Sequence, residues 1–118
     1  MTAKVLMADA DGPTIGSERH AADLIGEAFS AGAKVVAIPL TRLAPEFLDL
    51  KTRLAGEVLQ KFVNYGFVVV IVGDVSEAVA RSQPLADFVR ESNRGRQVWF
   101  VADPAALERK IAAGLAAD

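Results

Sequence analysis

An unbroken apolar run at residues 67–72, FVVVIV, most constrains how this chain can fold. The run does not alternate apolar with polar residues, so it predicts a strand that is covered on both faces. The two expected faces are Val68, Val70 and Val72 on one side, and Phe67, Val69 and Ile71 on the other. A chain with such a strand needs helices on both sides of its sheet.

Residues 47–66 are predicted to form a helix that leads directly into this strand. Apolar residues recur there at helical spacing, which is typical of a helix packed on a core. They are Leu50, Leu54, Val58, Leu59, Phe62 and Tyr65. Gly66 suits the left-handed conformation that commonly ends a helix.

Strands and helices alternate along the rest of the chain. Further strands are expected at residues 4–9, 34–39 and 97–102, and residues 40–46 are expected to be a loop in which Pro45 starts a helical turn. Ser17, Pro84 and the pair Asp103-Pro104 are typical helix starts. The predicted apolar faces are Ala21, Leu24, Ile25, Ala28 and Phe29, then Leu85, Phe88 and Val89, and finally Leu107, Ile111 and Leu115. Residues 77–83 are predicted to be a polar, mobile segment. The pattern predicts one α/β domain over residues 1–118, with a single, mainly parallel sheet.

Composition excludes several classes of function. Thirteen Lys and Arg against fifteen Asp and Glu give a net charge of -2, which argues against a nucleic-acid or membrane-surface binder. The chain has no cysteine and one histidine, His20, so thiolate chemistry and a histidine-rich metal site are excluded. No metal, cofactor or catalytic set is expected. Without a signal pattern or a membrane-spanning run, we expect a cytoplasmic protein.

The loops that follow the strands are expected to form the functional edge of the sheet. The central helix begins at that edge, and its dipole and free N–H groups favour an anion there. The candidate binding residues are Asp49, Lys51, Thr52, Arg53, Asp74 and Ser76. Asp49, Lys51 and Arg53 also fit a helix cap with solvated charges, and Asp74 and Ser76 also fit a simple turn.

A secondary candidate is an anion-binding patch at the end of the third helix. Its residues are Arg90, Ser92, Asn93, Arg94 and Arg96. Arginines are also favoured at a helix C-terminus because they complement its dipole. Both interpretations stay open at the level of sequence.

Several motifs resemble a bacterial family described as domain of unknown function 4180. They are FLDLKT at residues 47–52, LAGE at 54–57, LQKFVNY at 59–65 and IVGD at 71–74. DF at 87–88, RESN at 90–93 and QV at 97–98, with Ser76 and Gly95, continue the resemblance over most of the chain. The family description implies no activity.

More distantly, the chain resembles the fold of sulfate transporters and anti-sigma-factor antagonists, which implies a STAS-like α/β domain. Antagonists of that fold carry an Asp-Ser-Ser-Gly-type motif where the central helix starts, and phosphorylation of one serine breaks a protein contact. Asp49 matches the aspartate, whereas the serine pair is absent and Thr52 is the nearby hydroxyl. The resemblance therefore implies a partner contact at this helix, with Thr52 as the candidate for modification.

Two functions follow as hypotheses. The first is a non-enzymatic regulatory or interaction module whose protein partner is unknown. The second is a binder of, or an enzyme for, a small anionic ligand at the carboxyl edge of the sheet, through Lys51, Thr52, Arg53, Asp74 and Arg81. A weak homodimer is also expected, because a short first strand leaves a sheet edge available.

Overall fold

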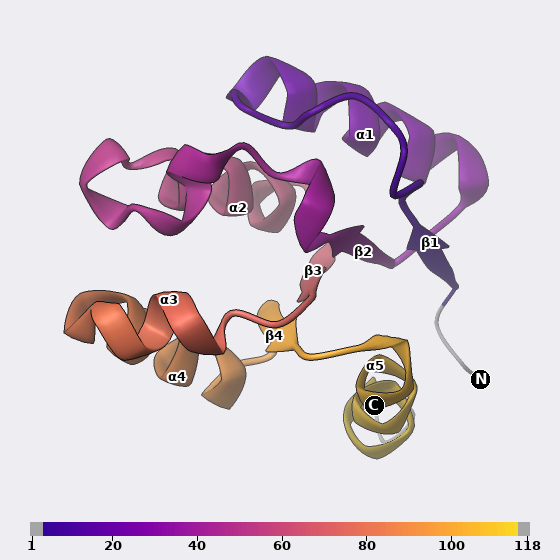
Figure 1. Ribbon diagram of the computed structural model, residues 1–118. Coiled ribbons are helices and arrows are strands. Elements are labelled where there is room, and N and C mark those ends of the chain that lie inside the picture. The colour runs from indigo at the N-terminus through magenta and orange to yellow at the C-terminus, as the bar shows by residue number, and fades with distance from the viewer. Residues whose placement is uncertain (1–3, 116–118) are drawn as a thin grey trace.

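The computed structural model describes residues 4–115, in which four parallel strands form one sheet (Figure 1). The strands are β1 (Val5–Met7), β2 (Val35–Pro39), β3 (Val68–Val72) and β4 (Val98–Val101), in the order β1-β2-β3-β4. Ala37 of β2 lies opposite Val70 of β3, and Val70 lies opposite Trp99 of β4. The predicted α/β class and the central position of residues 68–72 are confirmed.

Helices connect the strands, and short turns of other helical types precede or extend them. The helices are α1 (Glu18–Ala31), α2 (Leu54–Asn64), α3 (Ser76–Arg81), α4 (Gln83–Arg94) and α5 (Pro104–Lys110). The 3₁₀ turns are η1 (Leu40–Arg42), η2 (Pro45–Leu48) and η3 (Leu50–Thr52), and the π turn η4 is Ile111–Leu115. Ser17 and Asp103 cap α1 and α5 through their side chains, as predicted.

The helices cover the two faces of the sheet unequally. Figure 1 shows α1, α2 and the α3–α4 pair on one side of the sheet and α5 on the other. Val69 and Ile71 lie in the larger core cluster under α1, α2 and α4, whereas Val70 lies in a smaller cluster with Trp99 and Leu107. This is the predicted division of the strand. Right-handed crossovers between strands in sequential order place their helices on one face, so among the described residues the other face is left to α5 and the turn η4 that extends it.

The central helix is shorter than predicted. It begins at Leu54 rather than near residue 47, because Arg53 has a φ of 65° and ψ of 3°. A residue in this left-handed conformation cannot continue a right-handed helix. The preceding residues instead form the 3₁₀ turns η2 and η3. Phe47 of η2 is buried, and Leu50 of η3 is partly buried.

Two aromatic residues that were predicted to face the core are exposed. Phe29 is 57% exposed and Tyr65 is 54% exposed. The ring of Phe29 lies edge-on to those of Tyr65 and Phe67, with centroids 6.0 and 5.1 Å apart. Both residues lie at the last turn of their helix, where no further layer covers them. Phe29 and Tyr65 thus form an exposed aromatic pair beside the buried ring of Phe67, at the amino ends of the strands.

The polar segment at residues 77–83, whose predicted mobility stays a prediction, contains helical structure. Residues 76–81 form α3, although none of them is buried. The Asp74 carboxylate accepts a hydrogen bond from the Ser76 N–H at 2.9 Å, which satisfies a donor at the start of this helix.

In the last predicted helix, Leu107 is buried and Ile111 is partly buried, whereas the surroundings of the Leu115 side chain lie outside the described residues.

Candidate functional site

Residues 49–53 form a hydrogen-bonded turn that we call the entrance turn. The Asp49 Oδ1 atom accepts a hydrogen bond from the Lys51 N–H at 3.1 Å. The Thr52 hydroxyl lies 2.8 Å from the carbonyl oxygens of both Glu46 and Asp49, and its oxygen accepts from the Leu54 N–H at 3.3 Å. Thr52 thus links η2, η3 and the first turn of α2. These contacts fix the backbone of the turn.

Arg53 gives the entrance turn an unusual backbone. Among the described residues, it is the single non-glycine residue with a positive φ. The left-handed conformation costs an arginine about 1–2 kcal/mol relative to the ordinary helical region. Asp49, Lys51 and Arg53 are all exposed, and neither cation forms an ion pair within residues 4–115. The turn therefore presents three charged side chains on a fixed backbone.

Asp74 and Ser76 belong to a different cap, after β3. Hydrogen bonds from the Ser76 hydroxyl, and then from its N–H, lower the pKa of Asp74 below its ordinary value of 3.8. A cavity of about 250 Å³ lies beside them, with walls of Val75, Val79 and Phe100 among others. The turn η3 packs against η2 and α2, whereas α3 packs against α4 (Figure 1). The structure thus groups residues 49–53 in one turn and places Asp74 and Ser76 in another.

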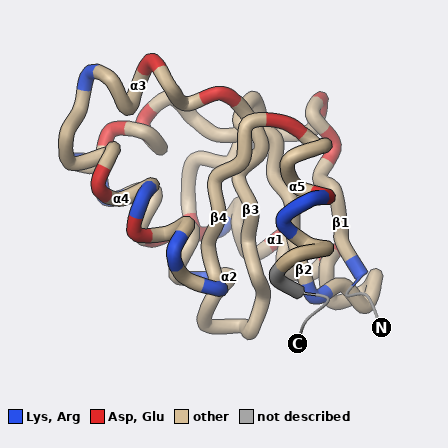
Figure 2. The backbone as a smooth tube through the Cα atoms, turned by 90° about the horizontal axis from the view of Figure 1, so that it is seen from below, with Lys and Arg blue, Asp and Glu red and all other residues tan. Residues whose placement is uncertain are grey.

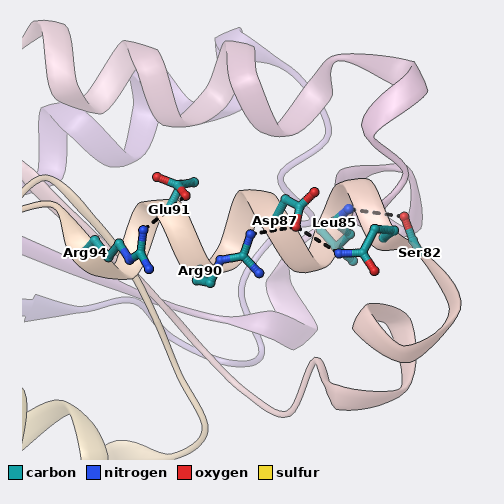
Figure 3. A network of polar contacts seen from close by, with 7 residues as sticks. Ser82, Leu85, Asp87, Arg90, Glu91 and Arg94 are labelled. Atoms are coloured by element: carbon teal, nitrogen blue, oxygen red, sulfur yellow. Dashed lines mark hydrogen bonds and ion pairs between the residues drawn. The ribbon is translucent and has the colours of Figure 1, made fainter.

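The secondary arginine patch lies on a helix whose cations have acidic neighbours (Figure 3). Arg90 contacts Asp87 at 2.8 Å, and Arg94 contacts Glu91 at 3.5 Å. A hydrogen bond from Gln83, and then one from Arg90, lower the pKa of Asp87. Pairing with these carboxylates reduces the charge that Arg90 and Arg94 can offer to an anion.

Asn93, from the same patch, supports the sheet. Its Oδ1 atom accepts a hydrogen bond from the Phe100 N–H at 2.7 Å. This contact occupies the amide side chain at the edge of β4. Asn93 is therefore a structural residue of the α4–β4 junction. Arg96 also makes an interaction within the structure.

Arg42 is a polar residue that sequence reasoning missed. Its side chain is buried, with 8% of the residue exposed. Its Nε atom donates to the Pro13 carbonyl, and its Nη1 atom donates to the Asp9 carbonyl, each at 2.7 Å. Its guanidinium fills the space where Gly12 has no side chain, because a Cβ there would lie 2.5 Å from Nη1. Arg42 therefore ties the loop after β1 to the turn after β2.

A cleft of about 610 Å³ lies between this loop, β1 and α1. Its charged or titratable lining residues are Asp9, His20, Asp23, Glu27 and Arg42. The His20 Nδ1 atom accepts a hydrogen bond from the Gly16 N–H at 3.0 Å. Three carboxylates and one arginine make the cleft acidic. No local pattern marks it, because the two partners of Arg42 lie 29 and 33 residues away in the chain.

Within residues 4–115, no group of three His, Asp or Glu side chains is arranged to hold a metal ion. No helix in this same range is both long enough and apolar enough to cross a membrane.

The fold and the entrance turn define a small α/β domain with a parallel four-stranded sheet and a fixed, charged surface turn. The family model described as domain of unknown function (DUF4180) matches residues 1–111, so the chain belongs to this family. A search of the curated proteins and a search of the solved structures each found no match. The family assignment confirms the resemblance seen in the sequence, and the likeness to the STAS fold stays a prediction.

Proposed function

We propose that this protein is a non-enzymatic, cytoplasmic regulatory module that binds a protein partner through the entrance turn. The observation that carries the proposal is the left-handed conformation of Arg53 in an exposed, hydrogen-bonded turn. Glycine would adopt this conformation without the steric cost. A charged residue in this conformation is better explained by contact with another molecule than by stability.

The chemistry of the turn suits a protein surface. Asp49, Lys51 and Arg53 present one negative and two positive side chains within five residues. Because hydrogen bonds already order the backbone, a partner would not have to order it on binding. Exposed charges of this kind steer association and set specificity more than they add affinity. The expected partner surface carries acidic groups opposite Lys51 and Arg53.

Thr52 is the proposed switch of this contact. Its hydroxyl already donates within the turn, so a phosphoryl group on Oγ1 removes that donor. Phosphorylation also adds about two negative charges beside Asp49, Lys51 and Arg53. Repulsion from Asp49 and attraction to the two cations would rearrange the turn. The STAS-like resemblance supports this proposal, because antagonists of that fold are switched at the same place.

Affinity capture with the full chain as bait tests the contact. We expect the double variant Asp49→Ala with Lys51→Ala to lose proteins that the wild type captures. The matched control is Glu91→Ala with Arg94→Ala on α4, which also removes one exposed charge of each sign. Capture of the same proteins by all three baits would show that the entrance turn is not the contact.

The alternative function, binding of a small anionic ligand at the carboxyl edge, has less support. The cavity beside Asp74 is lined by that carboxylate and by mainly apolar side chains. A carboxylate repels an anion, and neither Lys51 nor Arg53 lines this cavity. Arg81 is exposed on α3. We therefore place the functional contact at the entrance turn.

A further inference from the structure

The two edge strands of the sheet, β1 and β4, differ in whether their outward backbone N–H and C=O groups are covered. At β4, Val69 and Gly73 donate to the carbonyls of Gln97 and Val101, so Phe100 points its N–H away from the sheet. That outward N–H is bound by the Asn93 side chain at 2.7 Å, and α4 packs against β4. The β4 edge is therefore protected from pairing with another strand.

The outer side of β1 lacks such protection among the described residues. The carbonyl of Lys4 accepts from Lys34 and Val35, and the N–H of Ala8 donates to Ala37. By alternation, Val5 and Met7 direct their N–H and C=O groups away from β2. Met7 is also 45% exposed. This open edge offers two donors and two acceptors at the spacing of an added strand.

The acidic cleft lies beside this open edge. On α1, Glu18 and Phe29 face the α2 side, where Glu18 shares a surface hollow with Gly56 and Glu57. Asp23 and Glu27 lie on the opposite side of the helix and line the cleft with Leu6 and Met7 of β1. Figure 2 shows acidic positions directly after β1 as well. An added strand would therefore run along a row of carboxylates.

We propose that the open edge of β1 and the acidic cleft together bind an extended peptide in which basic and apolar residues alternate. The peptide backbone pairs with Val5 and Met7 by strand addition. Side chains of an added strand alternate between the two faces of the sheet. Its Lys or Arg side chains face Asp23 and Glu27, and its apolar side chains lie beside Met7 on the other face.

A second copy of this chain fits the edge less well. Two β1 strands paired about a two-fold axis would bring both α1 helices to the same seam. Asp23 and Glu27 of each copy would then face those of the other, and like charges at such a seam oppose association. Charge complementarity therefore favours a basic peptide over the homodimer expected from the sequence. This site does not depend on the entrance turn.

Fluorescence anisotropy of the full chain tests the proposal with a labelled hexapeptide, acetyl-Lys-Val-Arg-Val-Lys-Val-amide. A peptide of the same composition with its three basic residues first, Lys-Arg-Lys-Val-Val-Val, controls for charge alone. We expect saturable binding of the alternating peptide that weakens as salt is added, and at least about tenfold weaker binding of the control. Equal binding of the two peptides, or no binding up to millimolar protein, would overturn the proposal.

Two variants separate the side-chain and backbone parts of the site. Asp23→Asn with Glu27→Gln should weaken binding about tenfold or more, whereas Glu18→Gln with Glu57→Gln, on the α2 side, should not change it. Met7→Pro removes an outward N–H while Ala8 keeps its bond to β2, so it should also weaken binding. Light scattering without peptide completes the test. A concentration-dependent mass of twice 12.5 kDa that Met7→Pro abolishes would instead assign the edge to a second copy and overturn the proposal.

Discussion

Arg42 is a residue whose importance follows from its burial and its hydrogen bonds. It donates to two backbone carbonyls in the loop after β1. Because the residue is only 8% exposed, water has little access to these carbonyls. Truncation leaves both carbonyls without this donor and empties the space beside Gly12.

We therefore expect Arg42→Ala to lower the free energy of unfolding by about 2–4 kcal/mol. Arg42→Lys should recover only part of the loss, because an ammonium cannot reproduce the fork of the guanidinium. Urea denaturation measures both changes. Arg19→Ala, which removes an exposed arginine from α1, is the control and should change stability by less than about 0.5 kcal/mol. A similarly small loss for Arg42→Ala would show that the loop does not need this residue.

Asp74 and Asp87 are hydrogen-bonded carboxylates whose contribution to stability can be tested by pH. Both have pKa values below 3.8, Asp74 through Ser76 and Asp87 through Gln83 and then Arg90. A depressed pKa in the folded state stabilises the protein above the pKa of the unfolded state, and this contribution is lost as pH falls through the folded value. Both contributions should therefore be present at neutral pH and should disappear below about pH 3.8.

NMR titration of the side-chain carboxyl carbons can measure each pKa separately. Ser76→Ala should raise the pKa of Asp74 toward its ordinary value and leave Asp87 unchanged. Gln83→Ala should raise the pKa of Asp87 and leave that of Asp74 unchanged, so each variant is a control for the other. If neither substitution moves the pKa of its own aspartate, the hydrogen bonds assigned to these two carboxylates are incorrect.

At the scale of elements, β3 is the part of the fold that sequence predicts best. Its pattern is local and unbroken, and Val69, Val70 and Ile71 are fully buried. Val70→Asp should lower the free energy of unfolding by several kcal/mol, on the order of 3–5, because it buries an unpaired charge. Ala80→Asp on the exposed side of α3 is the control, with little expected change. Circular dichroism during heating measures both melting temperatures. Equal melting of the two variants would contradict the central, buried position of β3.

Other elements depend on contacts that a linear pattern does not contain. Caps such as Ser17 and Asp103 were predictable because the donor and acceptor lie within three residues. The start of α2 was not, because neither glycine nor asparagine marks the left-handed position at Arg53. The helix α3 was missed because it buries no side chain, so its sequence shows no apolar stripe.

The part of the candidate site that depends on local contacts was also predictable from the sequence. Asp49, Lys51, Thr52 and Arg53 are neighbours in sequence, so their presence in one turn required little tertiary information. The acidic cleft brings together β1, α1 and Arg42, which are distant in sequence. Whether Asp74 and Ser76 share a partner with the entrance turn stays a prediction.

At the scale of the whole molecule, the sheet order places loops from all four strands along one edge. The entrance turn follows β2 at this edge, and the acidic cleft follows β1 beside it. Within residues 4–115, three crossover segments cover one face of the sheet, while α5 and Ile111 of η4 pack on the other (Figure 1). The arrangement thus leaves the carboxyl edge available for contacts while the core lies between the sheet and its helices.

The central claim is that Arg53, in its left-handed conformation, contacts a protein partner. Affinity capture with the Arg53→Gly variant as bait tests this claim most directly. Glycine relieves the steric cost but gives the unfolded chain more freedom, so stability should be unchanged or higher by up to about 1 kcal/mol. The account predicts that this variant, although at least as stable as the wild type, fails to capture partners that the wild type captures. An Arg53→Gly bait that retains every partner of the wild type would contradict it.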